Sequence, residues 1–560
     1  MDGALLFAVR AALAMGLVAV PIAQAGRPDL AVYAMLGSFT TTFGRNLPYA
    51  RRARVLPLVA LAMTASVGCG SALAVWAHPQ AGGVGAAAVV AATALVAGLV
   101  KFVCDATHLS GLGAVLLLFS FAVAANDSPT PADVLPYTAL AAVGASFACL
   151  LGVSGWLVHP DRPQRLAVAI ALRKLTALLE ASDAGDVPRQ TRHGATVAVL
   201  HAYHCLGLSP PVAARRAELG RDAVFVHLTD LCWTLLIGTA RRPYGDRAAM
   251  AHRLRLQARL LTDRRRRIPP VLSELSILPR PSGPTLDVRD GMVRRPAGTA
   301  TARNDPAAMR AAELLVGRPG GPDHLPALAV PAVRMALGTG VAGGLALFLH
   351  LEHGYWAAVT AAAVLHSVNL RTTAQRAAQR SLGTAVGLLL ALGVLAADLN
   401  PVALTMVIVI LEFFLEYVVA RNYALGVVFL TPMALLLSDL AAPAPAGALV
   451  VDRMLGSVVG IAVGLLCALL VVHDHAAVRA ERALAACTQA AELAERSLAQ
   501  PDGPSLPIVQ VHLAQAVVKL READNAAAGE LWPAGIDPAE LATAEQRAYH
   551  LLDRLHRHRL

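Results

Sequence analysis

The sequence predicts an all-α polytopic membrane protein: two parallel six-helix transmembrane repeats, a helical cytoplasmic domain between them and a helical C-terminal tail. The 560 residues are 56% hydrophobic and only 15% charged, with a mean hydropathy of +0.55. A soluble domain carries about 25% charged residues, so this composition argues against a soluble enzyme. Aromatic residues make up 5%, and the apolar blocks are rich in Ala, Leu, Val and Gly. This composition favours closely packed helices over a membrane β-barrel.

The first repeat is expected over residues 1–157. A helix that crosses the hydrocarbon core needs about 20 residues. The first apolar block, Leu5–Pro21, lacks a basic leader and a small-residue cleavage site, so we expect it to be retained as a span. The candidate spans lie near 4–24, 55–76, 83–103, 109–125 and 136–157, with a shorter segment near 29–43.

Residues 158–278 are predicted to form the cytoplasmic helical domain, because their apolar positions recur at helical spacing. The apolar run Val224–Thr239 is short and contains charged Asp230, which favours a buried helix over another span. The basic run Arg264–Arg267 has no interleaved aromatic residues, so lipid headgroups are the expected partner and nucleic acid is not. Residues 279–328, rich in Pro, Gly and Arg, are expected to be a flexible linker.

The second repeat is expected over residues 329–472, followed by the tail, residues 473–560. The tail should contain helices at Ala483–Leu498, near 508–530 and near 538–557. Because the tail is slightly acidic and the central region basic, we expect the two to pack together. The spans of the second repeat lie near 330–350, 380–397, 401–418, 421–438 and 446–472, with a short segment near 355–368.

Basic residues set the expected orientation, because loops rich in Lys and Arg stay in the cytoplasm. With Met1 in the cytoplasm, the basic loops fall inside, and only Arg27 falls outside. Both termini are therefore predicted to be cytoplasmic.

Basic residues also indicate an internal repeat. Arg45 and Arg54 are nine residues apart after the first short segment, as are Arg371 and Arg380 after the second. Six spans per half is an even number, so both halves should enter the membrane in the same direction.

Charged residues inside a span cost roughly 2.5–3.5 kcal/mol on insertion scales, so each needs a reason. Glu412 and Glu416 are four residues apart and share one helix face. Glu412 is the candidate for proton coupling. Glu416 could share that role or pair with Arg421 at the cytoplasmic interface.

Two further positions carry charge within spans. Arg10 and Arg334 could each attract an anion or extend to the membrane surface, and the second alternative is favoured for Arg334. Asp452 and Arg453 are neighbours whose side chains point about 100° apart, so each should pair with another helix.

The two short segments could mark a transport pathway. Each has about 14 residues, or about 21 Å of helix, which is too little to cross alone. Matching interrupted segments point to a transport site, although tilted spans are the alternative. Tyr355 and Trp356 could instead belong to an interfacial aromatic belt. The polar and aromatic residues of these segments are Ser38, Thr40, Thr41, Thr42, Tyr355, Trp356, Thr360, His366 and Ser367.

Motifs for catalysis or metal binding are missing from the sequence. It contains no Walker A lysine loop, no GxSxG and no HExxH, and its seven cysteines form no CxxC pair. We therefore expect no enzyme activity, metal or cofactor.

Several short motifs of the second half form a recognisable set, namely Tyr355–Thr360, Arg371, Gln375–Arg376, Gln379–Gly387, Arg421–Ala424, Phe429–Pro432 and Asp452–Gly460. With these motifs, the second half resembles the fusaric acid resistance (FUSC) family of bacterial inner-membrane proteins. It implies a multi-pass transport protein of the bacterial plasma (inner) membrane, with relatives that export aromatic carboxylic acids and a more distant similarity to plant aluminium-activated malate channels. It also implies that Trp356, Thr360, Arg376, Arg380, Gly383 and Thr384 lie near the functional core. The first half departs from this pattern, with Pro57 and Leu58 where the second half has Gly383 and Thr384.

The leading functional hypothesis is efflux of small organic anions, aromatic carboxylates in particular, with proton coupling through Glu412. The alternatives are a passive organic-anion channel and a non-transporting envelope scaffold. The expected partners are the lipid bilayer and small organic anions, and assembly into a homo-oligomer is left open. The residues expected to line the pathway are Arg10, Ser38, Thr41, Arg45, Arg54, Trp356, Thr360, Arg371, Arg376, Arg380, Thr384, Glu412, Glu416, Arg421, Asn422, Asp452 and Arg453.

Overall fold

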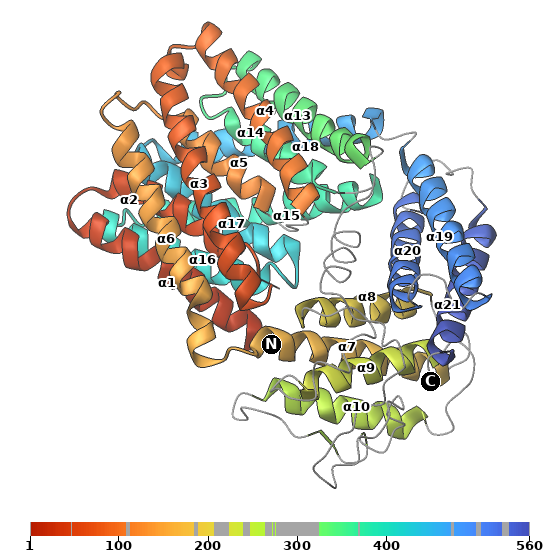
Figure 1. Cartoon of the computed structure of the whole chain (residues 1–560). Helices are drawn as coiled ribbons and strands as arrows, with labels where there is room; N and C mark the ends of the chain where they lie inside the picture. The colour runs from red at the N-terminus through yellow and green to blue at the C-terminus, as the bar shows by residue number, and fades with distance from the viewer. Residues whose placement is uncertain are drawn as a thin grey trace, which may run out of the picture. The chain divides into compact units, whose positions relative to one another are not determined.

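A computed structural model shows nineteen α-helices and two short 3-10 helices in the part of the chain that it describes, with no strand among those residues (Figure 1). The chain divides into two compact units. Unit 1 contains Met1–Pro160 and Leu325–Asp474, and unit 2 contains Asp161–His324, His475–Ala528 and Pro533–Leu560. The described residues are 2–45, 47–107, 113–183, 189–206, 223–238, 247–263, 271–272, 275, 324–367, 370–471, 475–499, 506–528 and 537–558. The run Arg264–Arg267 and residues 279–323 of the expected linker lie outside them.

Unit 1 contains two series of six α-helices. The first series is α1 (Asp2–Gln24), α2 (Pro28–Ser38), α3 (Tyr49–Ala77), α4 (Gly83–Thr107), α5 (Gly113–Ala125) and α6 (Val134–Val158), with the 3-10 helices η1 (Phe39–Thr42) and η2 (Pro79–Ala81). The second series is α13 (His324–Phe348), α14 (Tyr355–Leu365), α15 (Leu370–Leu395), α16 (Pro401–Val418), α17 (Tyr423–Ala441) and α18 (Ala446–Val471).

Nine of the described helices are long and apolar enough to cross a membrane, namely α1, α3, α4, α6, α13, α15, α16, α17 and α18. Large apolar side chains such as Leu58 and Leu61 are two-thirds exposed on their outer faces. Such surfaces suit contact with lipid. The protein is therefore a multi-pass membrane protein.

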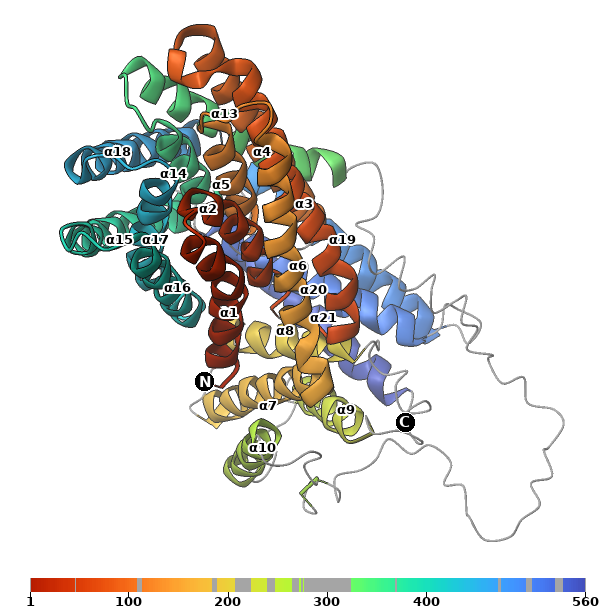
Figure 2. The same cartoon turned by 90° about the vertical axis from the view of Figure 1, so that its left-hand side faces the viewer.

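Of the span expected near 109–125, the described helix α5 covers Gly113–Ala125, and all 13 of its residues are buried. Residues 109–112 lie outside the described residues. Figure 2 shows α5 and α14 between α3 and α4 on one side and α15 and α18 on the other. Other helices of unit 1 therefore surround α5.

The boundaries expected for two spans are wrong, because both helices begin earlier. Helix α3 begins at Tyr49, so Arg54 lies in the helix instead of in a loop. Helix α15 begins at Leu370 and therefore includes Arg371 and Arg376. Arg, Ala and Gln are good helix formers, so the helices extend beyond their apolar part. Hydropathy places the end of a span at the first charges and therefore misses this extension.

The helices of unit 1 pack in matching pairs. Within the first series α2 packs on α6 and α3 on α5, and within the second α14 packs on α18 and α15 on α17. Between the series, α2 contacts α17 and α14 contacts α5. Helix α1 packs on α16, and α4 lies against α13, where a Cβ at Gly98 would be 3.0 Å from that of Ala336. We call the end of unit 1 at which α1, α3, α13 and α15 begin its basal end.

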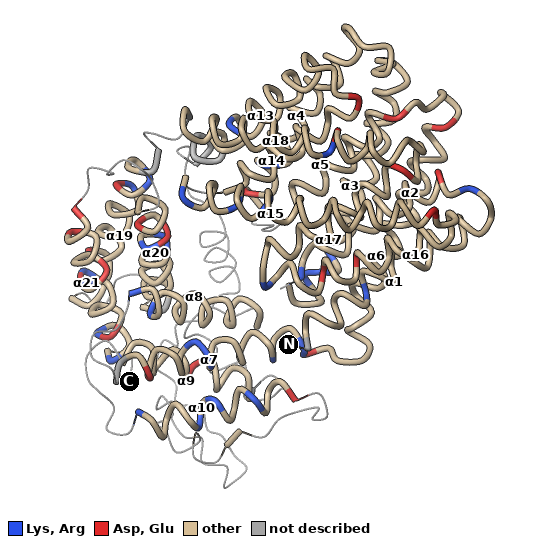
Figure 3. Tube along the Cα trace, turned by 180° about the vertical axis from the view of Figure 1, so that it is seen from behind, with Lys and Arg blue, Asp and Glu red and all other residues tan. Residues whose placement is uncertain are grey.

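Unit 2 consists of α7 (Arg162–Asp183), α8 (Arg189–Cys205), α9 (Ala223–Gly238), α10 (Arg247–Thr262), α19 (His475–Ala499), α20 (Leu506–Ala527) and α21 (Pro538–Arg557). These helices carry charges along their length, whereas charges are sparse in unit 1 (Figure 3).

A single apolar core joins the central and tail helices of unit 2. It includes Leu172 and Trp233 from the central region and Leu513 and Leu552 from the tail. Helix α20 packs on α8, and α21 on α9. The expected packing of the tail on the central region is confirmed. Helix α9 is a buried core helix, as its length and charges predict.

Candidate functional site

A buried arginine stacked on a tryptophan is the most unusual feature of unit 1. The Arg453 guanidinium carbon lies 3.7 Å from the centroid of the Trp356 ring. The residues are 1% and 2% exposed, respectively. Two glycines allow α18 this close to α14, since a Cβ at Gly456 would lie 3.1 Å from that of Trp356, and one at Gly460 only 2.7 Å from that of Thr360. The Trp356 ring therefore lies in the protein interior, and the interfacial-belt alternative is wrong for it.

A second buried arginine lies close to the first. Arg380 of α15 is 2% exposed, and its charge acts on that of Arg453. Its Nη2 donates a hydrogen bond to Thr360 Oγ1 at 3.2 Å, and its Nη1 to the Tyr423 hydroxyl at 3.4 Å. Phe119 of α5 stacks on Trp356, with ring centroids 5.6 Å apart.

Neither guanidinium has a carboxylate partner among the described residues. The Nε of Arg380 and both Nε and Nη1 of Arg453 are buried without a hydrogen-bond partner, as are the hydroxyls of Thr384 and Thr431. Two desolvated cations with unused donors are costly unless an anion compensates them. We call Trp356, Thr360, Arg380 and Arg453 the arginine–tryptophan site.

The carboxylates of α16 form a separate buried site. Glu412 and Glu416 are 1% and 2% exposed. Thr42 of η1 donates to Glu416 Oε1 at 2.7 Å, and Arg45 Nη1 lies 3.9 Å from Glu416 Oε2. Glu412 Oε2 is buried without a partner. We call Thr42, Arg45, Glu412 and Glu416 the carboxylate site.

The expected pairing of Glu416 with Arg421 is wrong. Arg421 is exposed, and its guanidinium lies over the Tyr417 ring at 4.6 Å. Helix α16 instead turns Glu416 toward η1, which contributes the Thr42 hydroxyl.

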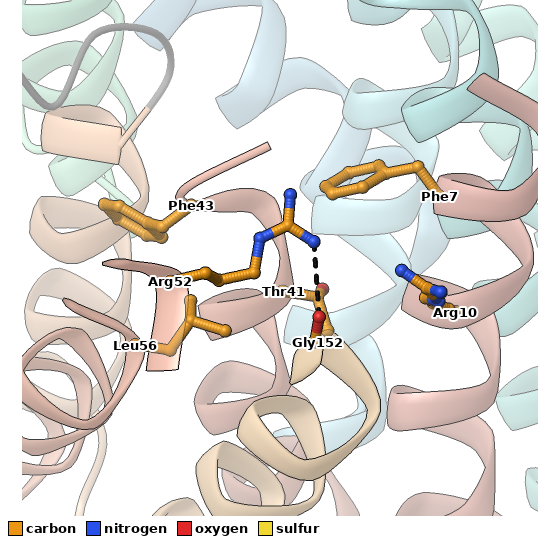
Figure 4. A pocket seen from close by; sticks show the side chains of 7 residues that line it. All are labelled: Phe7, Arg10, Thr41, Phe43, Arg52, Leu56 and Gly152. Atoms are coloured by element: carbon orange, nitrogen blue, oxygen red, sulfur yellow. Dashed lines mark hydrogen bonds between the residues drawn. The ribbon is translucent and has the colours of Figure 1, made fainter. Parts of the chain in front are cut away.

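A small cavity lies at the basal end of the first series (Figure 4). Its volume is about 10 Å³, on the order of one water molecule. Arg10 and Arg52 lie on either side of Thr41 there. Arg52 donates to the carbonyls of Gly44, Arg45 and Gly152 at 2.9, 2.6 and 3.2 Å. The lining residues are Phe7, Arg10, Thr41, Phe43, Arg52, Leu56 and Gly152.

Arg52 is 6% exposed, whereas Arg54 is exposed. Sequence reasoning chose Arg54 because it repeats the spacing of Arg371 and Arg380, and it missed Arg52. The spacing does not predict a shared environment, because Arg380 is buried and Arg54 is not. The apolar residue Leu56, four positions after Arg52 and also buried, is the signal that could have identified the buried face of α3.

Arg334 is buried instead of extending to the surface, so that expectation is wrong. Its Nη2 donates to the carbonyl oxygens of Leu365 and Ser367 at 3.1 and 2.7 Å. The contact fixes α13 to the end of α14.

Other expected pathway residues have local partners. The Ser38 and Thr41 hydroxyls donate to main-chain oxygens three residues earlier. Asn422 accepts from the main-chain amides of residues 424 and 425 and caps α17. Asp452 pairs with His353 at 2.9 Å, and His353 lies in the turn before α14, so the expected pairing of Asp452 with another helix is wrong.

The remaining two basic residues lie near the start of α15. Arg371 is exposed. Arg376 is half-buried, with its guanidinium 5.6 Å from the Tyr423 ring centroid. Of these two arginines, only Arg376 therefore lies beside Tyr423, the residue whose hydroxyl accepts a hydrogen bond from Arg380.

Comparison with known proteins agrees with the sequence resemblance. Residues 341–467 match a family model described as fusaric acid resistance protein-like. The chain is 25% identical over 570 aligned residues to an uncharacterized membrane protein, YvaC, of Bacillus subtilis (strain 168), covering 97% of this chain and 84% of that protein. No solved structure matches the chain. The matched region contains the arginine–tryptophan site together with Glu412 and Glu416. The predicted resemblance is confirmed: this multi-pass membrane protein carries, over residues 341–467, a region similar to the fusaric acid resistance proteins.

Proposed function

We propose that the protein exports small organic anions, aromatic carboxylates in particular, across the bacterial inner membrane. The observation that carries this proposal is the arginine–tryptophan site, in which two buried guanidinium groups have no carboxylate partner within the described part of the chain. A guanidinium group binds a carboxylate through two parallel hydrogen bonds. The aromatic side chains beside it, Trp356 and Phe119, suit stacking with an aromatic ring.

The matching helix pairs of unit 1 support the two-repeat interpretation within this proposal. Each short helix, α2 or α14, packs on the sixth helix of its own series and contacts the fifth helix of the other. Two parallel repeats related by an axis along the membrane normal have this arrangement. With the basal end in the cytoplasm, the basic residues at the starts of α3 and α15 obey the positive-inside rule.

The carboxylate site supplies a route for proton coupling. Each carboxylate is buried and keeps one oxygen without a hydrogen-bond partner, but Glu416 also accepts from Thr42 and lies near Arg45. A carboxylate in such a position can take up a proton from one side of the membrane and release it to the other. In our proposal, Glu412 carries the proton and Glu416 positions it electrostatically.

Flux measurements in proteoliposomes test the proposal. Release of a panel of labelled aromatic carboxylates would be followed with an imposed pH gradient and, separately, with a membrane potential. We expect saturable flux that requires the pH gradient and that Glu412→Gln uncouples from it. Flux that follows voltage alone, with no effect of Glu412→Gln, would indicate the passive channel.

A scaffold protein is separated from both transport modes by Arg380→Gln. The variant should lose flux if Arg380 binds the anion, and Arg421→Gln is the matched control because Arg421 is exposed. Absence of flux from the unmodified protein under every condition would contradict the transport proposal.

A further inference from the structure

An arginine with unused hydrogen-bond donors borders the cavity at the basal end of the first series. Arg10 of α1 is half-buried and lines this cavity together with Arg52 of α3 and Thr41 of η1 (Figure 4). Among the described residues, Arg10 makes no hydrogen bond and no ion pair, whereas Arg52 donates to three main-chain carbonyls. The guanidinium group of Arg10 is therefore available to a ligand.

Tyr49 brings the two arginines close together. It lies on α3 and is 5% exposed, and its ring centroid is 5.4 Å from the Arg52 guanidinium carbon. Gly155 of α6 leaves the space that the Tyr49 hydroxyl and the Arg10 Nη2 share, because a Cβ at this position would overlap both groups. The Tyr49 hydroxyl has no hydrogen-bond partner in the described part of the chain. Two unused donors, one of them charged, thus lie side by side next to the cavity.

The positive charge at this cavity lacks a counter-charge. The charge of Arg10 acts on Arg52, which is 6% exposed. No carboxylate forms an ion pair with either guanidinium group among the described residues. Burial strengthens the repulsion between like charges, since the dielectric constant there is lower than in water. An anion between the two arginines replaces this repulsion with two attractions, so the cavity favours an anion.

The size of the cavity favours an anion of a single atom. Its volume is about 10 Å³, whereas a cavity that binds benzene measures about 150 Å³. It therefore has room for one water molecule or one halide ion, and not for the ring of an aromatic carboxylate. Its lining residues come from α1, η1, α3, α6 and the segment after η1, so a bound ion contacts several elements of the first series.

We propose that this cavity is a chloride site. Arg10 binds the ion through a charge-assisted hydrogen bond, and the Tyr49 hydroxyl donates a second one. Arg52 remains bound to the carbonyls and stabilises the ion by its charge. The site is separate from the arginine–tryptophan site and takes a ligand of a different class, an inorganic halide instead of an organic anion.

The chloride site adjoins the carboxylate site. Thr41 lines the cavity, and the next residue, Thr42, donates to Glu416 at 2.7 Å. Arg52 donates to the Arg45 carbonyl, and the Arg45 guanidinium lies 3.9 Å from Glu416. The bound ion therefore stabilises the segment 41–45, which holds Glu416. Chloride binding requires no transport, so this inference does not depend on the proposed function.

Isothermal titration calorimetry of the full chain in phosphatidylcholine nanodiscs tests the inference, with sodium chloride added to protein in sodium gluconate of equal ionic strength. We expect a saturable chloride site that Arg10→Gln weakens about tenfold or more, because a charge-assisted hydrogen bond is lost. Arg10→Lys retains the charge and should recover most of the affinity. Arg54→Gln is the matched control, since it removes an exposed arginine of the same series. Equal weakening by Arg54→Gln, or no saturable chloride binding, would overturn the proposal.

Tyr49→Phe provides a test that does not depend on the folding of Arg10→Gln. It keeps the ring beside Arg52 and removes only the hydroxyl group. We expect chloride to bind about threefold more weakly or worse, because one hydrogen bond to the ion is lost. Unchanged affinity in this variant would contradict the proposed site.

Two further titrations identify the site and the anion. Arg453→Gln should leave the Arg10-dependent chloride affinity unchanged, and chloride binding that only Arg453→Gln removes would belong to the arginine–tryptophan site and overturn the proposal. Saturating benzoate should not displace the ion, because the cavity has no room for the ring. Displacement of the Arg10-dependent chloride by benzoate would overturn the assignment to a halide.

Discussion

At the scale of single residues, the placement of charge in unit 1 is governed by the cost of desolvation. An exposed arginine such as Arg421 needs no partner, because water solvates it. Arg52 and Arg334 compensate their burial by donating to main-chain carbonyls. The Arg453 guanidinium instead lies against the face of the Trp356 ring, and two of its nitrogens have no hydrogen-bond partner. This difference separates arginines that tie helices together from an arginine available to a ligand.

Trp356→Leu should weaken anion binding about tenfold or more, because a desolvated cation–π contact contributes about 2 kcal/mol or more. The substitution removes the ring that orients the Arg453 guanidinium. The dissociation constant for labelled benzoate measures the effect. Trp156→Leu is the control, since Trp156 is 58% exposed on α6. Equal affinities in the two variants would contradict the role given to Trp356.

In unit 2, Tyr549→Phe should destabilise α21 by about 1 kcal/mol, because it removes a buried hydrogen bond. The Tyr549 hydroxyl lies 2.8 Å from Thr196 Oγ1, between the tail and α8. Hydrogen exchange of the α21 amides in the full chain reports the change. Arg547→Ala removes an exposed pair with Glu495 and should alter exchange much less. A larger effect from Arg547→Ala would refute this ranking.

At the scale of elements, close helix contacts depend on small residues. Glycine leaves space where a side chain would meet the neighbouring backbone, and small residues let membrane helices approach closely. Helix α18 shows both situations. Gly460 faces Thr360 of α14, whereas nothing lies within 4 Å of a Cβ built at Gly447.

Gly460→Ala should therefore separate α18 from α14 and disturb the arginine–tryptophan site, whereas Gly447→Ala should be tolerated. We expect a loss of stability of about 1–3 kcal/mol for the first variant, the usual range for overpacking. The temperature at which the purified protein loses its monodisperse peak on size exclusion compares the two. Equal temperatures would show that α14 can move at no cost.

At the scale of the whole molecule, the two stretches that form unit 2 are far apart in the sequence. Residues from both line one core, so neither stretch covers its apolar face alone. Burial of such surface contributes about 25 cal/mol per Å². The stability of the central helices therefore depends on the tail.

A chain ending at residue 474 lacks α19, α20 and α21 and should leave the central helices open to proteases. Limited proteolysis in native membranes, followed by mapping of the cleavage sites, tests this expectation. A chain ending at residue 557, which retains α21, is the control. Protection of α7 and α8 in the shorter chain would show that the central helices are stable alone.

The stability of unit 2 should also fall as the pH falls below about 6.5. Burial lowers the pKa of His193, His201 and His512 below the ordinary value of 6.5. The unfolded chain then binds more protons than the folded one, so their contribution is present above pH 6.5 and is lost at lower pH.

Glu545 contributes in the opposite sense, because burial raises the pKa of its carboxyl group. A variant in which the three histidines are replaced by Gln keeps the contribution of Glu545. The difference between this variant and the unmodified chain therefore reports the histidines alone. Between pH 7.5 and 5.5, hydrogen exchange in unit 2 should accelerate more in the unmodified chain than in the variant. The same acceleration in both would exclude the histidines as its cause.

By itself, the sequence determined that this is a helical membrane protein, where most of its helices lie and which family its second half resembles. These properties depend on apolar length and on local motifs, which are continuous along the chain. The short segment at α14 and the shared face of Glu412 and Glu416 were predictable for the same reason. Only the tertiary structure decided that Arg52, Arg380 and Arg453 are buried while Arg54 and Arg371 are not. It also decided that Arg10 and Arg52, from different helices, border one cavity, and that Glu416 faces Thr42 instead of Arg421. The burial of a charge depends on which face of its helix meets a neighbour, and that neighbour comes from a distant part of the chain.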